Sequence, residues 1–231
     1  MFQCSDLRAS VLVGLGLIAA PAAGSVEPVM LASFDAASSE TSRNWDEHSG
    51  NWWTVNDTVM GGRSSGGGLI RDGVMLFAGT LNTNGGGFTS VRSDRRPRGK
   101  PWDLSSFDGL RARVRGDGRA YTLRIYTGTR TRWGGEVSYR GSFTTERLID
   151  AEGRDAGGDG AWQDVFVPFS AFVPMWRGQD LTGRVEALDP AEVSGLGLML
   201  SDGMDGPFRL EMDWLRADEQ PETPEDRGDH P

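Results

Sequence analysis

The chain has 231 residues, 24 of them basic and 33 acidic, with a formal net charge of −9. This acidic balance argues against general nucleic-acid binding, because neutralising phosphates requires a basic surface. The single cysteine, Cys4, lies near the N-terminus, so we expect no disulfide, thiolate metal site or cysteine nucleophile in the rest of the chain.

The first predicted element is a targeting segment. Arg8 supplies a positive charge, an apolar run covers residues 11–20, and small residues at 20–23 offer a cleavage site, although Asp6 is atypical there. The apolar run is too short for a permanent membrane span. Residues 1–23 are therefore a predicted signal peptide, which favours a periplasmic or secreted protein; a cytoplasmic or mitochondrial location is the alternative.

From residue 29 to residue 217, short apolar runs alternate with polar residues and end at Gly, Asp, Asn or Pro. A period of two over many short runs is typical of strands with one buried face. The pattern predicts one all-β domain, an antiparallel β-sandwich of the jelly-roll type. Residues 218–231 are acidic and contain proline, and we expect them to be disordered. The predicted strands lie within 74–79, 110–115, 121–126, 165–169, 196–200 and 208–214.

Two segments, 53–64 and 84–92, combine turn-forming Asn-Asp and Gly-Gly pairs with large apolar residues. Such a composition is typical of a shaped loop, and neither segment has the pattern of a plain strand or helix. No helix is expected after either glycine cluster, and no Gly-Lys-Ser/Thr is present, so nucleotide binding is not expected. A structural role is favoured over a binding role for the first segment.

Catalysis has little support in the sequence. The only histidines are His48 and His230, so a histidine-based triad or a His-rich zinc site is not expected. Paired carboxylates could in principle hydrolyse glycosides, but the sequence does not pair them. Oxygen ligands for a structural calcium ion could come from Asp35, Glu211 and Asp213, with ordinary surface acids as the alternative; no other cofactor is expected.

Two further groups of side chains could form a binding surface. Arg111, Arg113 and Arg115 share one face of a strand, and Arg124 on the next strand also faces away from the core. Interleaved acids would make this stripe structural, whereas unpaired arginines could dock a carboxylate-bearing partner.

The second group is aromatic: Trp133, Tyr139 and Trp176 lie in or near loops. Aromatic side chains at such positions contact sugars or protein partners, or simply pack the loops.

The motifs resemble those of the complex I intermediate-associated protein 30 family. The resemblance runs from Trp53 and the Val55–Ser64 segment through 77–81, 84–92, 103–110 and 114–121, and then through 162–169, 172–178 and 206–211. It implies a galactose-binding-like sandwich and a non-catalytic, chaperone-like role in assembling NADH:ubiquinone oxidoreductase. The family offers no catalytic residues to carry over.

These observations predict a non-catalytic module that binds a protein partner, with an exported carbohydrate-binding module as the alternative and a glycan-processing enzyme as the third possibility. No nucleic acid or nucleotide is expected as a ligand. The candidate binding residues are Asn56, Asp57, Met60, Gly61, Gly62, Ser64, Gly86, Phe88, Arg92, Arg113, Arg124, Trp133, Tyr139 and Trp176.

Overall fold

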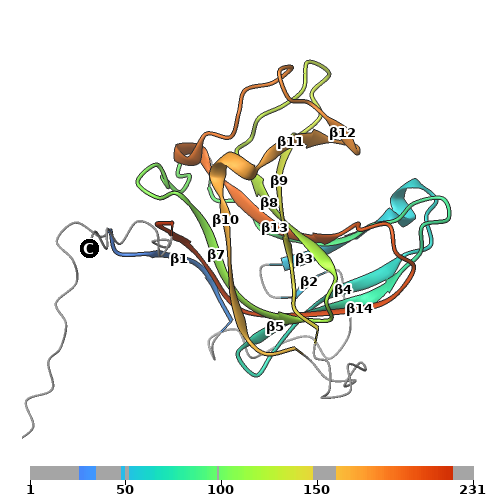
Figure 1. Ribbon diagram of the computed structural model, residues 1–231. Helices are drawn as coiled ribbons and strands as arrows, with labels where there is room; N and C mark the ends of the chain where they lie inside the picture. The colour runs from blue at the N-terminus through green and yellow to red at the C-terminus, as the bar shows by residue number, and fades with distance from the viewer. Residues whose placement is uncertain (1–25, 35–47, 50–51, 98, 148–159, 221–231) are drawn as a thin grey trace, which may run out of the picture.

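The computed structural model describes residues 26–34, 48–49, 52–97, 99–147 and 160–220. Within these ranges the chain forms two antiparallel sheets that pack face to face (Figure 1). The only helices in the described ranges are short 3-10 turns: η2 (Asp57–Met60), η3 (Phe169–Ala171) and η4 (Pro190–Glu192). The all-β antiparallel sandwich predicted from the sequence is confirmed. No helix in the described part of the chain is long and apolar enough to cross a membrane.

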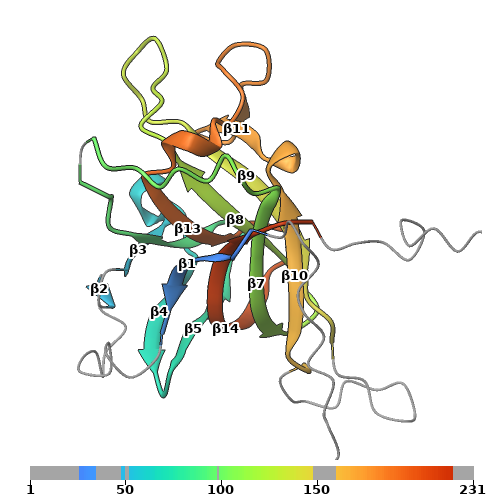
Figure 2. The same cartoon turned by 90° about the vertical axis from the view of Figure 1, so that its left-hand side faces the viewer.

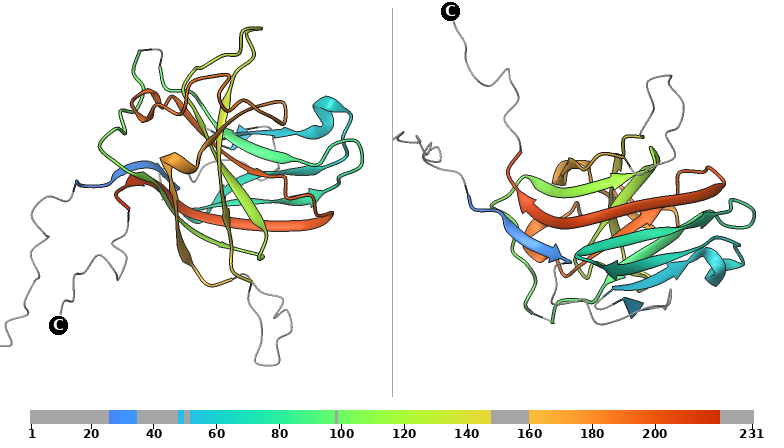
Figure 3. Two further views of the ribbon diagram at one scale, coloured as in Figure 1. Left: turned by 45° about the horizontal axis from the view of Figure 1, so that its top comes forward. Right: turned by 90° about the horizontal axis from the view of Figure 1, so that it is seen from below.

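The first sheet has six strands, and its longest strand, β14, pairs with both β5 and β7. The N-terminal strand β1 also pairs with β14, near the end of that strand (Figure 3). The strand order is β10 (Gln163–Pro168), β7 (Gly109–Gly116), β14 (Gly206–Asp218), β5 (Val74–Leu81) and β4 (Ser65–Arg71), with β1 (Val29–Ser33) beside β14. Strand β14 thus includes the first residue of the predicted acidic tail; residues 221–231 lie outside the described residues.

The second sheet has eight strands and carries the candidate site described below. Figure 2 shows two loops, residues 127–137 and the segment after β12, projecting beyond one end of the sandwich. The strand order is β12 (Gln179–Asp180), β11 (Val173–Trp176), β9 (Ser138–Thr144), β8 (Ala120–Tyr126), β13 (Gly195–Leu200), β6 (Thr89–Ser93), β3 (Trp52–Asn56) and β2 (His48–Ser49).

The core lies between the two sheets and follows the alternation seen in the sequence. On β7 the side chains of Leu110, Ala112 and Val114 are fully buried, and on β8 those of Leu123 and Ile125 are buried in the same way. Burying a large aliphatic or aromatic side chain stabilises the fold by about 1.5–3 kcal/mol. The intervening residues of both strands point to the outer faces of their sheets, so the core pattern also decides where the arginines go.

The outer face of the first sheet carries the arginine stripe, and acids alternate with it. The Arg111 Nε lies 2.6 Å from an Asp218 carboxylate oxygen, and Arg113 lies 3.4 Å from Asp164. Arg115 pairs with Glu211, which is itself buried. These pairs fit the structural alternative for the stripe, since every arginine of β7 has an acidic neighbour.

The placement of Arg124 differs from the expectation that it extends this stripe. Strands β7 and β8 follow each other in the chain but belong to different sheets. Arg124 does face away from the core, as expected, but on the outer face of the second sheet. The turn between the strands thus separates it from Arg113 by the thickness of the sandwich.

The segment that begins at residue 53 also differs from its prediction. Trp52–Asn56 is the regular strand β3, paired with β6, and Asp57–Met60 forms the turn η2. The sequence pattern did not predict this strand, because Asn and Asp at 56–57 are strong loop signals.

Candidate ligand-binding site

The Asp57 side chain organises the loop that borders the site. Its Oδ1 accepts a hydrogen bond from the Ser64 backbone N–H at 3.0 Å, and its Oδ2 accepts one from the Ser64 hydroxyl at 2.6 Å. The same Oδ2 accepts from the backbone N–H groups of Gly87 at 2.6 Å and Phe88 at 3.3 Å. Burial raises the pKa of Asp57, but these hydrogen bonds outweigh it and hold the pKa below its usual value.

The glycines around Asp57 are required by space. A Cβ atom at Gly62 would lie 2.2 Å from the Asp57 Cγ, and one at Gly86 would lie 2.3 Å from its Oδ2. Gly61 closes η2 at a φ of 88°, a conformation that favours glycine. The motif therefore clips residues 86–88 onto the end of β3, and it leaves Met60 exposed over 64% of its surface.

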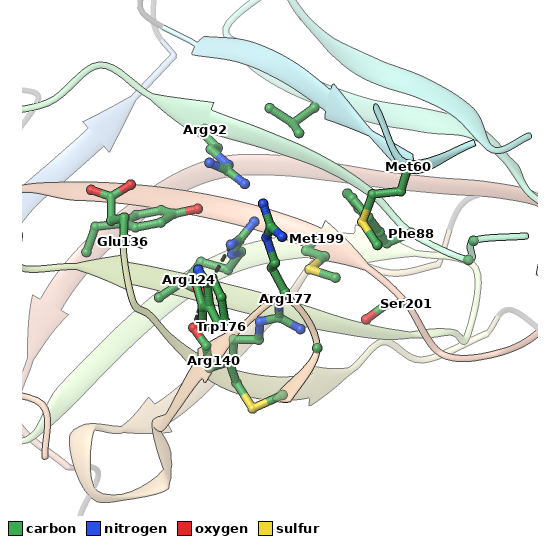
Figure 4. Close-up of a pocket in the computed structure, with 17 residues that line it drawn as sticks. Met60, Phe88, Arg92, Arg124, Glu136, Arg140, Trp176, Arg177, Met199 and Ser201 are labelled. Carbon is green, nitrogen blue, oxygen red and sulfur yellow. Dashed lines mark hydrogen bonds between the residues drawn. The ribbon is translucent and has the colours of Figure 1, made fainter. Parts of the chain in front are cut away.

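Beside this clip a cavity of about 810 Å³ opens on the outer face of the second sheet (Figure 4). Six strands contribute to it, and its floor is cationic while parts of its wall are apolar. The lining residues are Val55, Met60, Gly86, Gly87, Phe88, Arg92, Arg124, Tyr126, Glu136, Ser138, Arg140, Met175, Trp176, Arg177, Gly178, Met199 and Ser201.

Sheet register aligns three arginines across the floor. Arg92 on β6 lies opposite Gly197 on β13, and Gly197 lies opposite Arg124 on β8. Arg124 lies in turn opposite Arg140 on β9. Directly paired residues point to the same face of a sheet, so the three guanidinium groups form one row, and Gly197 leaves a gap in it. We call Arg92, Arg124 and Arg140 the arginine row.

The arginine row is partly buried and lacks hydrogen-bond partners at several of its nitrogens. Arg124 is only 5% exposed, and one of its terminal nitrogens donates to the Ser138 hydroxyl at 3.0 Å. The Nε atoms of Arg92, Arg124 and Arg140 have no hydrogen-bond partner, and neither does the Tyr126 hydroxyl. Burial lowers the pKa of Arg124 to about 9, with further lowering from the neighbouring arginines and an opposite effect of Tyr126. Burial also lowers the pKa of Arg140.

Glu136 is the one carboxylate among the described residues that line the cavity, and it does not neutralise the row. One of its oxygens lies 2.8 Å from a terminal nitrogen of Arg95. Arg95 in turn lies 3.7 Å above the Tyr126 ring. No ion pair joins any member of the arginine row to an acid within the described ranges. The floor therefore carries an excess of positive charge on a protein that is acidic overall.

Aromatic and strained residues border the cavity. The rings of Trp133 and Trp176 stack with centroids 5.9 Å apart, and Trp133 is 67% exposed. Arg177 turns the chain from β11 to β12 at a φ of 48°, followed by Gly178 at 81°. Two positive φ angles in a two-residue hairpin favour Asn-Gly, so an arginine here is unusual and costs stability. This turn places the Arg177 side chain 5.2 Å from the Trp176 ring (Figure 4).

The structure brings some of the predicted site residues together and separates others. Tyr139 is 1% exposed and donates a hydrogen bond to the Glu186 carbonyl at 3.1 Å, so it belongs to the core. Arg113 lies on the other sheet, and Asp57 and Ser64 are buried and bonded to each other. The predicted residues that line the cavity are Met60, Gly86, Phe88, Arg92, Arg124 and Trp176; Asn56, Gly61, Gly62 and Trp133 flank them in sequence or space.

The expected calcium ligands are otherwise engaged. Glu211 pairs with Arg115 and with Arg209, and Asp213 lies 3.7 Å from Arg113. Asp35 lies outside the described residues. The described residues contain no cluster of three potential metal ligands, and the calcium site stays a prediction.

Fold and cavity together define a β-sandwich with a cationic cavity on the outer face of one sheet. The chain belongs to the complex I intermediate-associated protein 30 family, whose model matches residues 39–212. The mitochondrial protein of this name from Mus musculus is 30% identical over 184 residues, covering 71% of this chain and 51% of the relative. The Drosophila melanogaster protein is 28% identical over 168 residues, covering 66% and 52%. The chain thus spans about half the length of these relatives.

The fold also matches solved structures. A family 11 carbohydrate-binding module of a Clostridium thermocellum cellulase superposes with a TM-score of 0.50 at 17% identity, covering 85% of this chain and 98% of that one. At this level of identity the likeness shows the shared sandwich fold and carries no ligand with it.

Proposed function

We propose that this protein is a non-catalytic, chaperone-like module that holds another protein, a subunit or subassembly of a complex I-type NADH:ubiquinone oxidoreductase, against the outer face of its second sheet. Membership of a family named for complex I intermediates supports this role. The observation that carries it is the cavity itself, whose floor is cationic and whose border exposes Met60 and Trp133. Binding hot spots in protein interfaces combine such aromatic, methionine and arginine side chains.

A catalytic role has less support in this cavity. Glycoside hydrolysis needs two carboxyl groups on opposite sides of the scissile bond. Glu136 is alone among the described lining residues and is already paired with Arg95. The surplus arginines bind and orient an anion but provide no general base at neutral pH.

The test is genetic and biochemical. Deleting the gene in its native cells should lower the amount of assembled NADH:ubiquinone oxidoreductase and accumulate its partial assemblies on native gels. The tagged protein should co-purify with subunits of that enzyme at near-physiological salt. A normal level of assembled enzyme in the deletion strain, with no co-purifying subunit, would contradict the proposal.

The same capture resolves the compartment. Sequencing the mature N-terminus shows whether the predicted signal peptide at 1–23 is removed after Ala22 or Ala23, as expected of an exported protein. An intact N-terminus would contradict the predicted signal peptide and favour the alternative location; the relatives are named as mitochondrial proteins. Export away from NADH:ubiquinone oxidoreductase would leave the assembly role without a site of action.

The stacked Trp133–Trp176 pair supports a second candidate, a carbohydrate-binding module. Sugar rings stack on exposed tryptophan faces. Titration with neutral oligosaccharides should then shift tryptophan fluorescence, and Trp133→Ala should abolish the shift. Trp162→Ala should leave it, because Trp162 precedes β10 and lies beside Arg115 of the first sheet. Unchanged fluorescence with a panel of oligosaccharides would contradict the carbohydrate-binding candidate and leave protein binding as the remaining proposal.

A further inference from the structure

The arginine row lacks the acidic neighbours that the arginines of β7 possess. Arg124 and Arg140 lie directly opposite each other on neighbouring strands, where like charges repel. Arg124 is buried, and the Nε atoms of all three arginines have no partner. An arrangement of this kind lowers the stability of the free protein, and an anion in the cavity would reverse that cost.

We propose that the arginine row binds one oxyanion group and that this group is a carboxylate of the partner protein, from an acidic side chain or a chain terminus. The inference rests on the proposed function, since it names the chemistry that the partner inserts into the cavity.

The geometry suits an oxyanion. Guanidinium groups present planar forks of N–H donors that match carboxylate and phosphate oxygens. The side chains of Arg92 and Arg124 flank Gly197, where no side chain intervenes. The Tyr126 hydroxyl lies in the same cavity without a hydrogen-bond partner and adds a donor, whereas the Ser138 hydroxyl already accepts from Arg124 and donates to the Met175 carbonyl.

The wall of the cavity favours a carboxylate on a polypeptide over a free inorganic ion. Met60, Met175, Met199 and Phe88 line the space beside the row. Methionine side chains adapt to varied apolar surfaces and are used where a protein binds different sequences. An acidic residue flanked by apolar residues would cover both the cationic floor and this wall, whereas phosphate would leave the wall exposed to water.

Thermal unfolding of the purified protein tests the site itself. Acetate and phosphate should each raise the midpoint of unfolding relative to chloride at equal ionic strength, because a ligand that binds only the native state stabilises it. The rise should disappear in Arg124→Met and in Arg140→Gln. It should persist in Arg113→Gln, which removes the same charge from the opposite sheet. No rise in the unaltered protein, or an equal rise in Arg124→Met, would overturn the proposal.

Short peptides test the carboxylate assignment. Acetyl-Leu-Glu-Leu-amide should bind at least tenfold more tightly than acetyl-Leu-Gln-Leu-amide in calorimetric titration, and the preference should vanish in Arg140→Gln. Equal affinities for the two peptides would refute a carboxylate site, and tighter binding of phosphate than of the glutamate peptide would assign the row to a phosphate-bearing ligand instead.

The outcome is separable from that of the proposed function. Partner capture that persists in Arg124→Met would refute the carboxylate site and leave the protein-binding role intact. If the protein binds carboxylates but captures no complex I subunit, the carboxylate site stands and the proposed assembly role is refuted.

Discussion

Replacing Arg124 with methionine should make the free protein more stable. The side chain is 5% exposed, and burial lowers its pKa from the ordinary arginine value to about 9. Each pKa unit corresponds to about 1.4 kcal/mol, so keeping this group charged in the folded state at pH 7 costs about 5 kcal/mol. Methionine preserves most of the apolar stem and loses the hydrogen bond to Ser138, which is worth about 1.5–3 kcal/mol. The net gain expected for Arg124→Met is therefore about 2–3.5 kcal/mol.

The sign of the pH dependence follows from the direction of the shift. A cation with a lowered folded-state pKa destabilises the fold fully below pH 9, and the penalty fades as the pH rises above 9, because the unfolded state then binds more protons than the folded state. The advantage of Arg124→Met should thus shrink by about 1.4 kcal/mol between pH 7 and pH 10. Arg92, Arg95, Arg140 and Tyr126 face the same group and are present in both proteins.

Urea unfolding at pH 7 and pH 10 measures both quantities. Arg113→Met is the matched control, since that side chain is 43% exposed and lies near Asp164 and Asp213, and it should change stability by less than about 1 kcal/mol. A loss of stability in Arg124→Met at pH 7 would refute the reasoning, because it would mean that Arg124 is a satisfied structural residue.

Three further changes are expected to show up in urea unfolding. Asp57→Asn should lower the free energy of unfolding by about 2–3 kcal/mol, because it weakens the hydrogen bonds from Ser64. The stability that Asp57 contributes should be lost as the pH falls below 4, through its lowered pKa. An unchanged stability of Asp57→Asn would mean that Asp57 does not hold this loop in place. Arg119→Gln should lower the free energy of unfolding by about 3–5 kcal/mol, because it leaves the buried Asp202 carboxylate, now 2.6 Å from Arg119, without an ion-pair partner. A loss below about 1 kcal/mol, as for an exposed ion pair, would contradict this. Arg177→Asn should gain about 1 kcal/mol at its positive φ, while an unchanged midpoint would show that the turn is unstrained.

The period-two pattern was sufficient to predict the strands with apolar side chains on one face. It did not reveal β9, whose inward positions are Tyr139, Gly141 and Phe143. Gly141 interrupts the apolar run because a Cβ atom there would lie 2.6 Å from the Val167 Cγ1 of β10. Close packing between the sheets requires glycine at this inward position, so the alternation of apolar residues that would have predicted β9 is incomplete. Arg140 was therefore not predicted as a site residue.

The site itself depends on register, which the sequence does not reveal. Arg92 is a candidate through the family motif, and Arg124 is one through the arginine stripe of β7, for unrelated reasons. They face the same cavity because β13 lies between β6 and β8 and pairs its Gly197 with both. A shift of one residue in either pairing would turn one guanidinium group into the core. Only the assembled sheet shows that these arginines and Arg140 share a face.

The arginines on the two outer faces of the sandwich differ in whether an acidic side chain neutralises them. On the first sheet each arginine of β7 has an acid from a neighbouring strand, as with Arg111 and Asp218. The chain has 33 acidic residues, so acids to neutralise the second sheet were available to it. The described residues nevertheless place none beside Arg124, in a cavity bordered by Met60. Uncompensated charge in an open cavity costs the free protein stability that a bound anion restores. This contrast supports the proposal that the outer face of the second sheet binds an anionic group of a partner.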